Sequence, residues 1–140
     1  MNRVLTFSLA GEEYGVDIRV VHEIISALPI TRVPMTPERV RGVINLRGSV
    51  IPVIDLKPEF NLPPATGDFC IVVVRVNGID VGIVVDRVSD VVELAEGAVQ
   101  PVPEFGGDRR AECLSGIAHV GERLCLLIDI ERALLDGVAR

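Results

Sequence analysis

The sequence predicts an all-β protein in which two related halves, residues 1–65 and 66–140, form a single domain. Val supplies 23 residues and Ile 13, while aromatic residues make up only 4% of the chain. Such β-branched side chains favour strands over helices. In addition, short apolar segments end at glycine-containing turns, and the order of glycines and acids in the first half returns in the second.

Short strands fill the first half in order. Leu5–Leu9 alternates apolar and polar residues, and a turn at Gly11 leads into Tyr14–Ile18. Val20–Ile25 is interpreted as a tight turn that enters a strand. Val50–Ile54 is also a strand, and we expect its proline at an edge or a bulge, because proline cannot donate to a strand ladder.

The second half opens with the clearest hairpin signal in the chain. Val72–Val76 and Val81–Val85 flank Asn77-Gly78, a pair that favours a two-residue hairpin turn. Helix is predicted at only two places. Thr36-Pro37 indicates one turn of helix, and Asp129 is expected to cap a short helix that runs through Leu135 and stops at Gly137.

An internal repeat relates the two halves. Gly11–Val16 recurs as Gly78–Ile83 at an offset of 67, and Ile54–Leu56 recurs as Ile128–Ile130 at an offset of 74. We therefore expect Gly11 to superpose on Gly78 and Asp55 on Asp129. About five strands in each half give too little core for independent stability. Each half is thus expected to curl into a small barrel and to bury a shared apolar face, with Leu62–Gly67 as the junction.

Composition and spacing argue against several functions. The net charge of −6 and pI of about 4.9 have the wrong sign for general nucleic-acid binding. No phosphate-binding glycine motif or metal-ligand spacing is found, so we predict no catalytic residue, no cofactor and no metal site. The two histidines are far apart, and the cysteines are read as reduced core residues: His22 and His119; Cys70, Cys113 and Cys125. The aliphatic runs are too short for direct membrane insertion, and without a secretory signal we expect a cytoplasmic protein.

Arginines gather in one stretch of the chain. Four fall close together, and Lys57 is the single lysine: Arg32, Arg39, Arg41 and Arg47. This run is either a solvated loop or a docking patch for an acidic partner. Arg47 lies in a turn next to Gly48, which permits positive φ. Arg47 either pairs locally with Glu23 or Asp55, or presents its guanidinium to a partner.

The chain resembles the CheW-like family of chemotaxis coupling proteins over nearly its whole length. The similar segments follow the order of the family pattern: Phe7–Leu9, Glu12–Ile18, Val21–Ile25, Thr31–Pro34, Thr36-Pro37, Gly42–Leu56, Val81–Val92, Pro101–Phe105 and Leu126–Leu134. The resemblance implies two SH3-like five-stranded barrels packed together, with short helical turns and a short C-terminal helix. It also implies a non-enzymatic adaptor that couples chemoreceptors to a histidine autokinase in bacterial or archaeal signalling arrays.

Partners and contact residues also follow from the resemblance. One surface would contact the cytoplasmic hairpin tip of the chemoreceptor, and others the regulatory domain of the kinase, so that the protein would join membrane receptor arrays through its partners. The family's interaction positions match Val21, Glu23, Gly42, Arg47, Gly82 and Val91. Val21, Ile24 and Val91 are expected to be partly exposed in an apolar groove between the barrels.

Two other functions are compatible with the sequence. The same fold serves as an adaptor in pilus motility or other chemosensory-like pathways, which fold and signature do not separate. A small-molecule-binding or catalytic β-barrel would instead require a deep pocket with converging polar groups.

Overall fold

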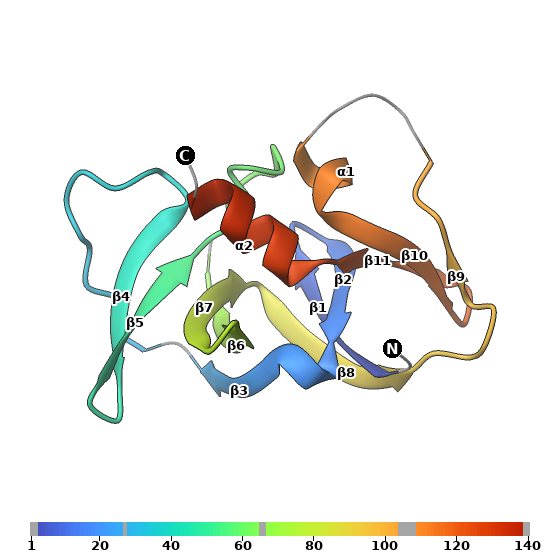
Figure 1. Ribbon diagram of the computed structural model, residues 1–140, viewed down its shortest axis with the longest axis horizontal. Helices are drawn as coiled ribbons and strands as arrows, with labels where there is room; N and C mark the ends of the chain where they lie inside the picture. Colours follow the sequence, from blue (N-terminus) through green and yellow to red (C-terminus); the bar gives the residue numbers. More distant parts are fainter. Residues whose placement is uncertain (1–2, 27, 65–66, 104–108, 139–140) are drawn as a thin grey trace.

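The computed structural model describes residues 3–26, 28–64, 67–103 and 109–138, and strands dominate it (Figure 1). In the described part of the first half there are five strands and a short 3₁₀ helix: β1 (Arg3–Leu9), β2 (Glu12–Asp17), η1 (Ile18–Val20), β3 (Val21–Ser26), β4 (Val40–Leu46) and β5 (Ser49–Ile54). The second half adds six strands and two helices: β6 (Cys70–Val76), β7 (Ile79–Val85), β8 (Arg87–Glu93), β9 (Val99–Gln100), α1 (Arg109–Cys113), β10 (Leu114–Val120), β11 (Arg123–Ile128) and α2 (Ile130–Val138).

The strands form two sheets, and each sheet takes strands from both halves of the chain. Sheet A has the order β8-β1-β2-β11-β10-β9, and sheet B has the order β3-β6-β7-β5-β4. The β1–β2 hairpin of the first half therefore sits among strands of the second half, and the β6–β7 hairpin sits among strands of the first. The expectation that each half curls into its own barrel is wrong, because the halves exchange their leading hairpins.

The repeat itself is visible in the strand pairing. Gly11 and Gly78 both occupy hairpin turns with positive φ, at 83° and 77°. The backbone N–H groups of Asp55 and Asp129 donate to Arg39 and Cys113, which are also 74 residues apart. The two sheets also use the same parallel pair, β5 with β7 in one and β11 with β2 in the other. Matched residues thus lie in matched elements, as the offsets predict.

The hydrophobic core has a shared part and two smaller parts. The largest cluster joins strands of both sheets with α2 and includes Phe7, Tyr14, Val74 and Ile83. A second cluster, with Ile44, Ile51, Val53, Ile71, Val73 and Val84, fills the interior of sheet B, and a third, with Val4, Leu94, Ala118, Cys125 and Leu127, fills that of sheet A. Because the largest cluster lies between the sheets, the two barrels form one packing unit.

Two local predictions at prolines and caps need correction. Thr36-Pro37 begins no helix: the Thr36 hydroxyl donates to the Val33 carbonyl at 2.9 Å, and Val40 N–H donates to Pro37 in a simple turn. Pro52 lies on β5, which is an interior strand of sheet B, and the bulge in the β4–β5 pairing falls elsewhere, at Arg41 of β4. Pro52 is tolerated opposite Val43, whose backbone N–H and C=O both bond to Thr31, so β4 needs no donor from Pro52.

The C-terminal helix is present and longer than predicted. The Asp129 carboxylate accepts a hydrogen bond from Arg132 N at 3.1 Å, which confirms the predicted N-cap. The helix nevertheless continues to Val138 and includes Gly137, which was expected to end it.

Candidate interaction surface

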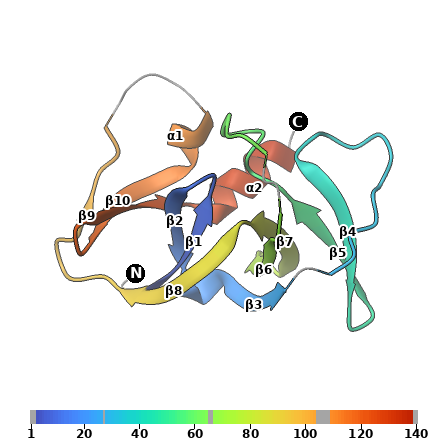
Figure 2. The same ribbon diagram turned by 180° about the vertical axis from the view of Figure 1, so that it is seen from behind.

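Strands β3 and β8 are edge strands of sheets B and A, and they carry the predicted apolar positions. Both run along the same side of the molecule in two opposite views (Figures 1 and 2). Each has an irregular register at an equivalent point, at His22 in β3 and at Ser89 in β8. Ile24 is 44% exposed and Val91 is 43% exposed, which is unusual for large aliphatic side chains. The two edges therefore present matched apolar residues to solvent.

Val21 differs from these two residues. It is half-buried on β3, where it pairs with Val74 of β6 and packs against the shared core cluster. Partial exposure agrees with the prediction, but part of the side chain supports the core. Ile24 and Val91 are therefore the better probes of the surface.

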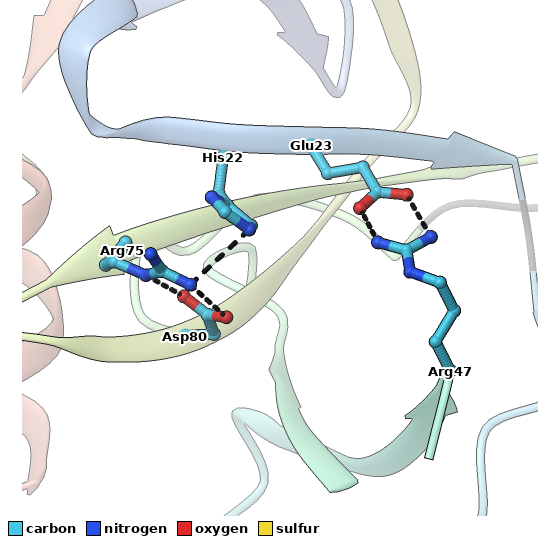
Figure 3. A network of polar contacts seen from close by, with 5 residues as sticks. All are labelled: His22, Glu23, Arg47, Arg75 and Asp80. Atoms are coloured by element: carbon cyan, nitrogen blue, oxygen red, sulfur yellow. Dashed lines mark hydrogen bonds and ion pairs between the residues drawn. The ribbon is translucent and has the colours of Figure 1, made fainter. Parts of the chain in front are cut away.

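A bidentate ion pair connects β3 to the β4–β5 turn. The Arg47 guanidinium donates to both Glu23 oxygens, with Nη1 at 3.0 Å from Oε2, as Figure 3 shows. Glu23 lies on one edge strand of sheet B and Arg47 on the hairpin of the other, so the pair draws the two edges of the curled sheet together. The hydrogen bond from Arg47 lowers the pKa of the Glu23 carboxyl below its ordinary value.

The turn that carries Arg47 is held by its backbone. Arg47 and Gly48 have φ values of 51° and 89° between the paired residues Leu46 and Ser49, the pattern of a type I′ hairpin turn. The Arg47 side chain remains 68% exposed. Of the two local partners considered from the sequence, Glu23 is the one found.

The remaining arginines of the cluster do not form a uniform patch. Arg41 takes the other candidate acid, Asp55, at 3.1 Å. Arg39 is only 7% exposed and pairs with Glu59 at 3.0 Å, while Arg32 is exposed. A docking patch that uses all four arginines is therefore excluded, because Arg39 is buried and paired with Glu59 inside the fold.

Gly42 and Gly82 are both buried in the fold. An added Cβ at Gly82 would lie 2.8 Å from Ile71 Cγ2, and one at Gly42 would lie 2.1 Å from the Thr31 carbonyl oxygen. This burial favours a role in the fold, and the contact role that the resemblance implies for Gly42 and Gly82 stays a prediction. Close packing explains the glycine at position 82, whereas Gly42 combines close packing with a φ of 143°, which L side chains rarely adopt.

Three further polar residues join this surface: Arg75 and Asp80, which were not singled out from the sequence, and His22, which was considered from it only as a possible metal ligand. Arg75 of β6 pairs with Asp80 of β7 at 2.7 Å, and Arg75 Nη2 approaches His22 Nε2 of β3 at 3.4 Å (Figure 3). A signal for the first pair was present, because the two-residue Asn77-Gly78 turn places residue 75 opposite residue 80.

Among the described residues, no group of three or more His, Cys, Asp or Glu side chains could hold a metal ion. Burial, together with the Glu13 carboxylate, raises the pKa of the Cys125 thiol to about 12, so this thiol is a poor nucleophile. No helix in the described ranges is long and apolar enough to span a membrane.

Open clefts lie at two places among the residues that the structure describes. One of about 370 Å³ lies in the loop between β3 and β4, and the other, of about 360 Å³, lies at the start of α2. The second is bordered by Asp17, Arg75 and Asp129, which already bond within the chain.

Comparison with known proteins assigns the chain to a family. Residues 3–137 match the CheW-like domain family. The chain belongs to the CheW-like domain family. It is 42% identical to a protein named chemotaxis protein CheW from Klebsiella aerogenes, over 97% of this chain and 87% of that protein. It is also 35% identical to protein FrzA from Myxococcus xanthus, over 81% of this chain and 71% of the relative.

A solved structure shares the fold. The crystal structure of the scaffolding protein TtCheW from Thermoanaerobacter tengcongensis superposes with a TM-score of 0.85 at 36% identity. The match covers 94% of this chain and 86% of that one. The all-β, two-barrel architecture predicted from the sequence is thereby confirmed.

Proposed function

We propose that this chain is a non-enzymatic adaptor of a chemotaxis pathway, which couples chemoreceptors to a histidine autokinase. The observation that carries the proposal is the pair of matched edge strands, β3 and β8, with Ile24 and Val91 exposed on them. The names of the relatives, chemotaxis protein CheW and scaffolding protein TtCheW, support the same role.

The surface suits a helical partner. An amphipathic helix docks by placing its apolar side chains in a groove, and exposed aliphatic residues on two neighbouring edges supply such contacts. The receptor's cytoplasmic hairpin tip is the partner proposed for β3 and β8. Glu23 and Arg47 lie beside them with charged groups that can pair with a polar rim. The kinase's regulatory domain is proposed to bind elsewhere on the barrels, in the cytoplasm at the receptor array.

The adaptor function is tested by recovery and by binding. Pull-down from the host cytoplasm should recover a histidine kinase together with receptors. Ile24→Asp and Val91→Asp should each weaken binding to a receptor hairpin peptide, because a carboxylate in an apolar contact must be desolvated. Leu124→Asp is the matched control, since Leu124 is 55% exposed on β11.

Two outcomes would contradict the proposal. Undiminished peptide binding by both edge-strand variants would remove the assigned surface. Recovery of pilus-motility or other chemosensory components, without chemotaxis receptors, would instead select the alternative pathway for the same adaptor.

A further inference from the structure

Asp86 lies where the chain crosses from one sheet to the other, and it bonds to both. β7 of sheet B ends at the preceding residue, and β8 of sheet A begins at the following one. Asp86 N–H donates to the Ser8 carbonyl at 3.0 Å, and Asp86 Oδ2 accepts from Ala10 N at 2.7 Å. The other carboxylate oxygen accepts from Lys57 Nζ, which follows β5 of sheet B. One carboxylate thus joins the β1–β2 hairpin of sheet A to the end of β5.

Lys57 is held firmly at this point. Its side chain is only 1% exposed, and its backbone N–H donates to Asp55 Oδ1 at 3.0 Å while its carbonyl accepts from Leu62 at 2.9 Å. A buried ammonium requires a partner of opposite charge, because an unpaired charge inside a protein is costly. Asp86 supplies that partner from the crossing segment, so the two residues constrain each other.

The second crossing, from β2 through η1 to β3, is built differently. The repeat offsets of 67 and 74 place Arg19 at the position of Asp86 and Glu131 at that of Lys57, with the charges reversed. Arg19 is 74% exposed and pairs with Asp17, only two residues away, and Glu131 is exposed. The 360 Å³ cleft, lined by Asp17 and Glu131, lies at this crossing. Here Arg19 bonds within its own segment, whereas Asp86 bonds across the sheets.

We propose that the Lys57–Asp86 ion pair acts as a latch, meaning that it holds the start of β8 in a fixed position relative to sheet B. Among the described residues, the crossing at η1 has no such ion pair between the sheets, and it is the one at which the two sheets can move relative to each other. The two edge strands begin immediately after the two crossings, β8 after Asp86 and β3 after η1. Movement of one sheet against the other is then concentrated at η1, and it changes the separation of the β3 and β8 edges. This difference between the two crossings belongs to the fold itself and does not depend on which partner binds.

The single lysine makes the latch directly measurable. Acetylation of Lys57 by an N-hydroxysuccinimide ester, followed by mass spectrometry, reports how often this amine becomes accessible. Relative to the same protein in urea, the folded wild type should react at least about a hundredfold more slowly, as for a group exposed only by opening. Asp86→Asn should accelerate the reaction of Lys57 about tenfold or more, because the buried ammonium loses its counter-charge.

Arg19→Gln is the matched control at the other crossing. It should leave acetylation of Lys57 within about twofold of wild type, because Arg19 lies on the segment that already opens.

Hydrogen exchange distinguishes a local latch from a general contribution to stability. In Asp86→Asn, amide protection should fall at Ala10 and at the start of β8 while β6 and β7 keep theirs. Lys57→Met, which leaves no buried charge, should give the same local pattern if Asp86→Asn does not fold.

Three results would contradict the latch. Equal protection of Lys57 in wild type and Asp86→Asn would overturn the latch. Loss of protection spread evenly over both sheets would make the pair a general stabiliser instead. Acceleration by Arg19→Gln equal to that by Asp86→Asn would remove the difference between the two crossings.

Discussion

Replacing Gly82 with alanine tests whether this buried glycine acts through packing or through partner contact. The new Cβ would lie 2.8 Å from Ile71 Cγ2 and 3.4 Å from Val53 Cγ2, and both neighbours are fully buried in the core of sheet B. The first distance is shorter than carbon atoms tolerate, so β7 or Ile71 must shift. Overpacking of this kind costs about 1–3 kcal/mol. For a chain of this length, about 3.5 °C per kcal/mol converts that loss to a Tm roughly 3–10 °C below wild type.

The assay combines thermal unfolding with binding to a receptor hairpin peptide, measured well below Tm. Ile79→Ala is the control on the same strand, because Ile79 is 60% exposed and its truncation should change stability by about 0.5 kcal/mol or less. Folded Gly82→Ala should bind the peptide as wild type does. An unchanged Tm with lost binding would refute the packing argument and restore a contact role for Gly82.

Three more outcomes are expected. In Arg47→Ala, NMR should show the Glu23 carboxyl titrating at higher pH than in wild type, because its depressed pKa comes mainly from Arg47. The Glu23–Arg47 pair stabilises the fold at pH values above the pKa that Glu23 has in the unfolded chain. This stabilisation is lost as the pH falls through the lower pKa that Glu23 has in the folded protein. At pH 8 iodoacetamide should modify half-buried Cys70 well before buried Cys125, whose pKa of about 12 leaves little thiolate, and equal rates would contradict this. Asp129→Ala should lower stability by about 0.5–2 kcal/mol in urea unfolding through loss of the α2 cap, whereas Asp129→Asn should retain most of it.

Local signals in the sequence predicted local structure well. Asn77-Gly78 specified a tight hairpin, and the paired residues Val76 and Ile79 flank that turn. The pattern of Val20–Ile25 predicts a turn that enters a strand, and the structure has η1 followed by β3. These features depend on neighbouring residues alone, which is why a single sequence suffices to find them.

Such local signals do not predict which strands pair when the strands are far apart in the sequence. The repeat revealed that the halves are alike, but two like halves can pair within themselves or exchange hairpins, since both arrangements use the same strands. The burial of Gly82 is a result of that exchange, because the glycine lies between β5 and β6 only when β7 has crossed into sheet B.

The candidate surface was predicted in part for the same reason. Ile24 and Val91 were selected by a resemblance, and only the pairing of β3 with β6 and β8 with β1 reveals their exposure. Glu23 and Arg47 are 24 residues apart, and the sequence left Asp55 as an equal partner for Arg47. The structure decides between them, because Glu23 of β3 reaches Arg47 at the β4–β5 turn while Asp55 pairs with Arg41.

The exchange of hairpins also affects the order of folding during synthesis. The β1–β2 hairpin leaves the ribosome first, yet its partners β8 and β11 are encoded some 70 residues or more later. Such pairs, far apart in sequence, slow folding because a long loop must close before they form. The growing chain thus displays an unpaired β1 edge until β8 has been translated, and an unpaired β2 edge until β11, near the end of the sequence, has followed. An unpaired strand edge is where chains associate wrongly. Circular permutation that begins the chain at β6 leaves this delay in place, because β6 and β7 then wait for β3 and β5.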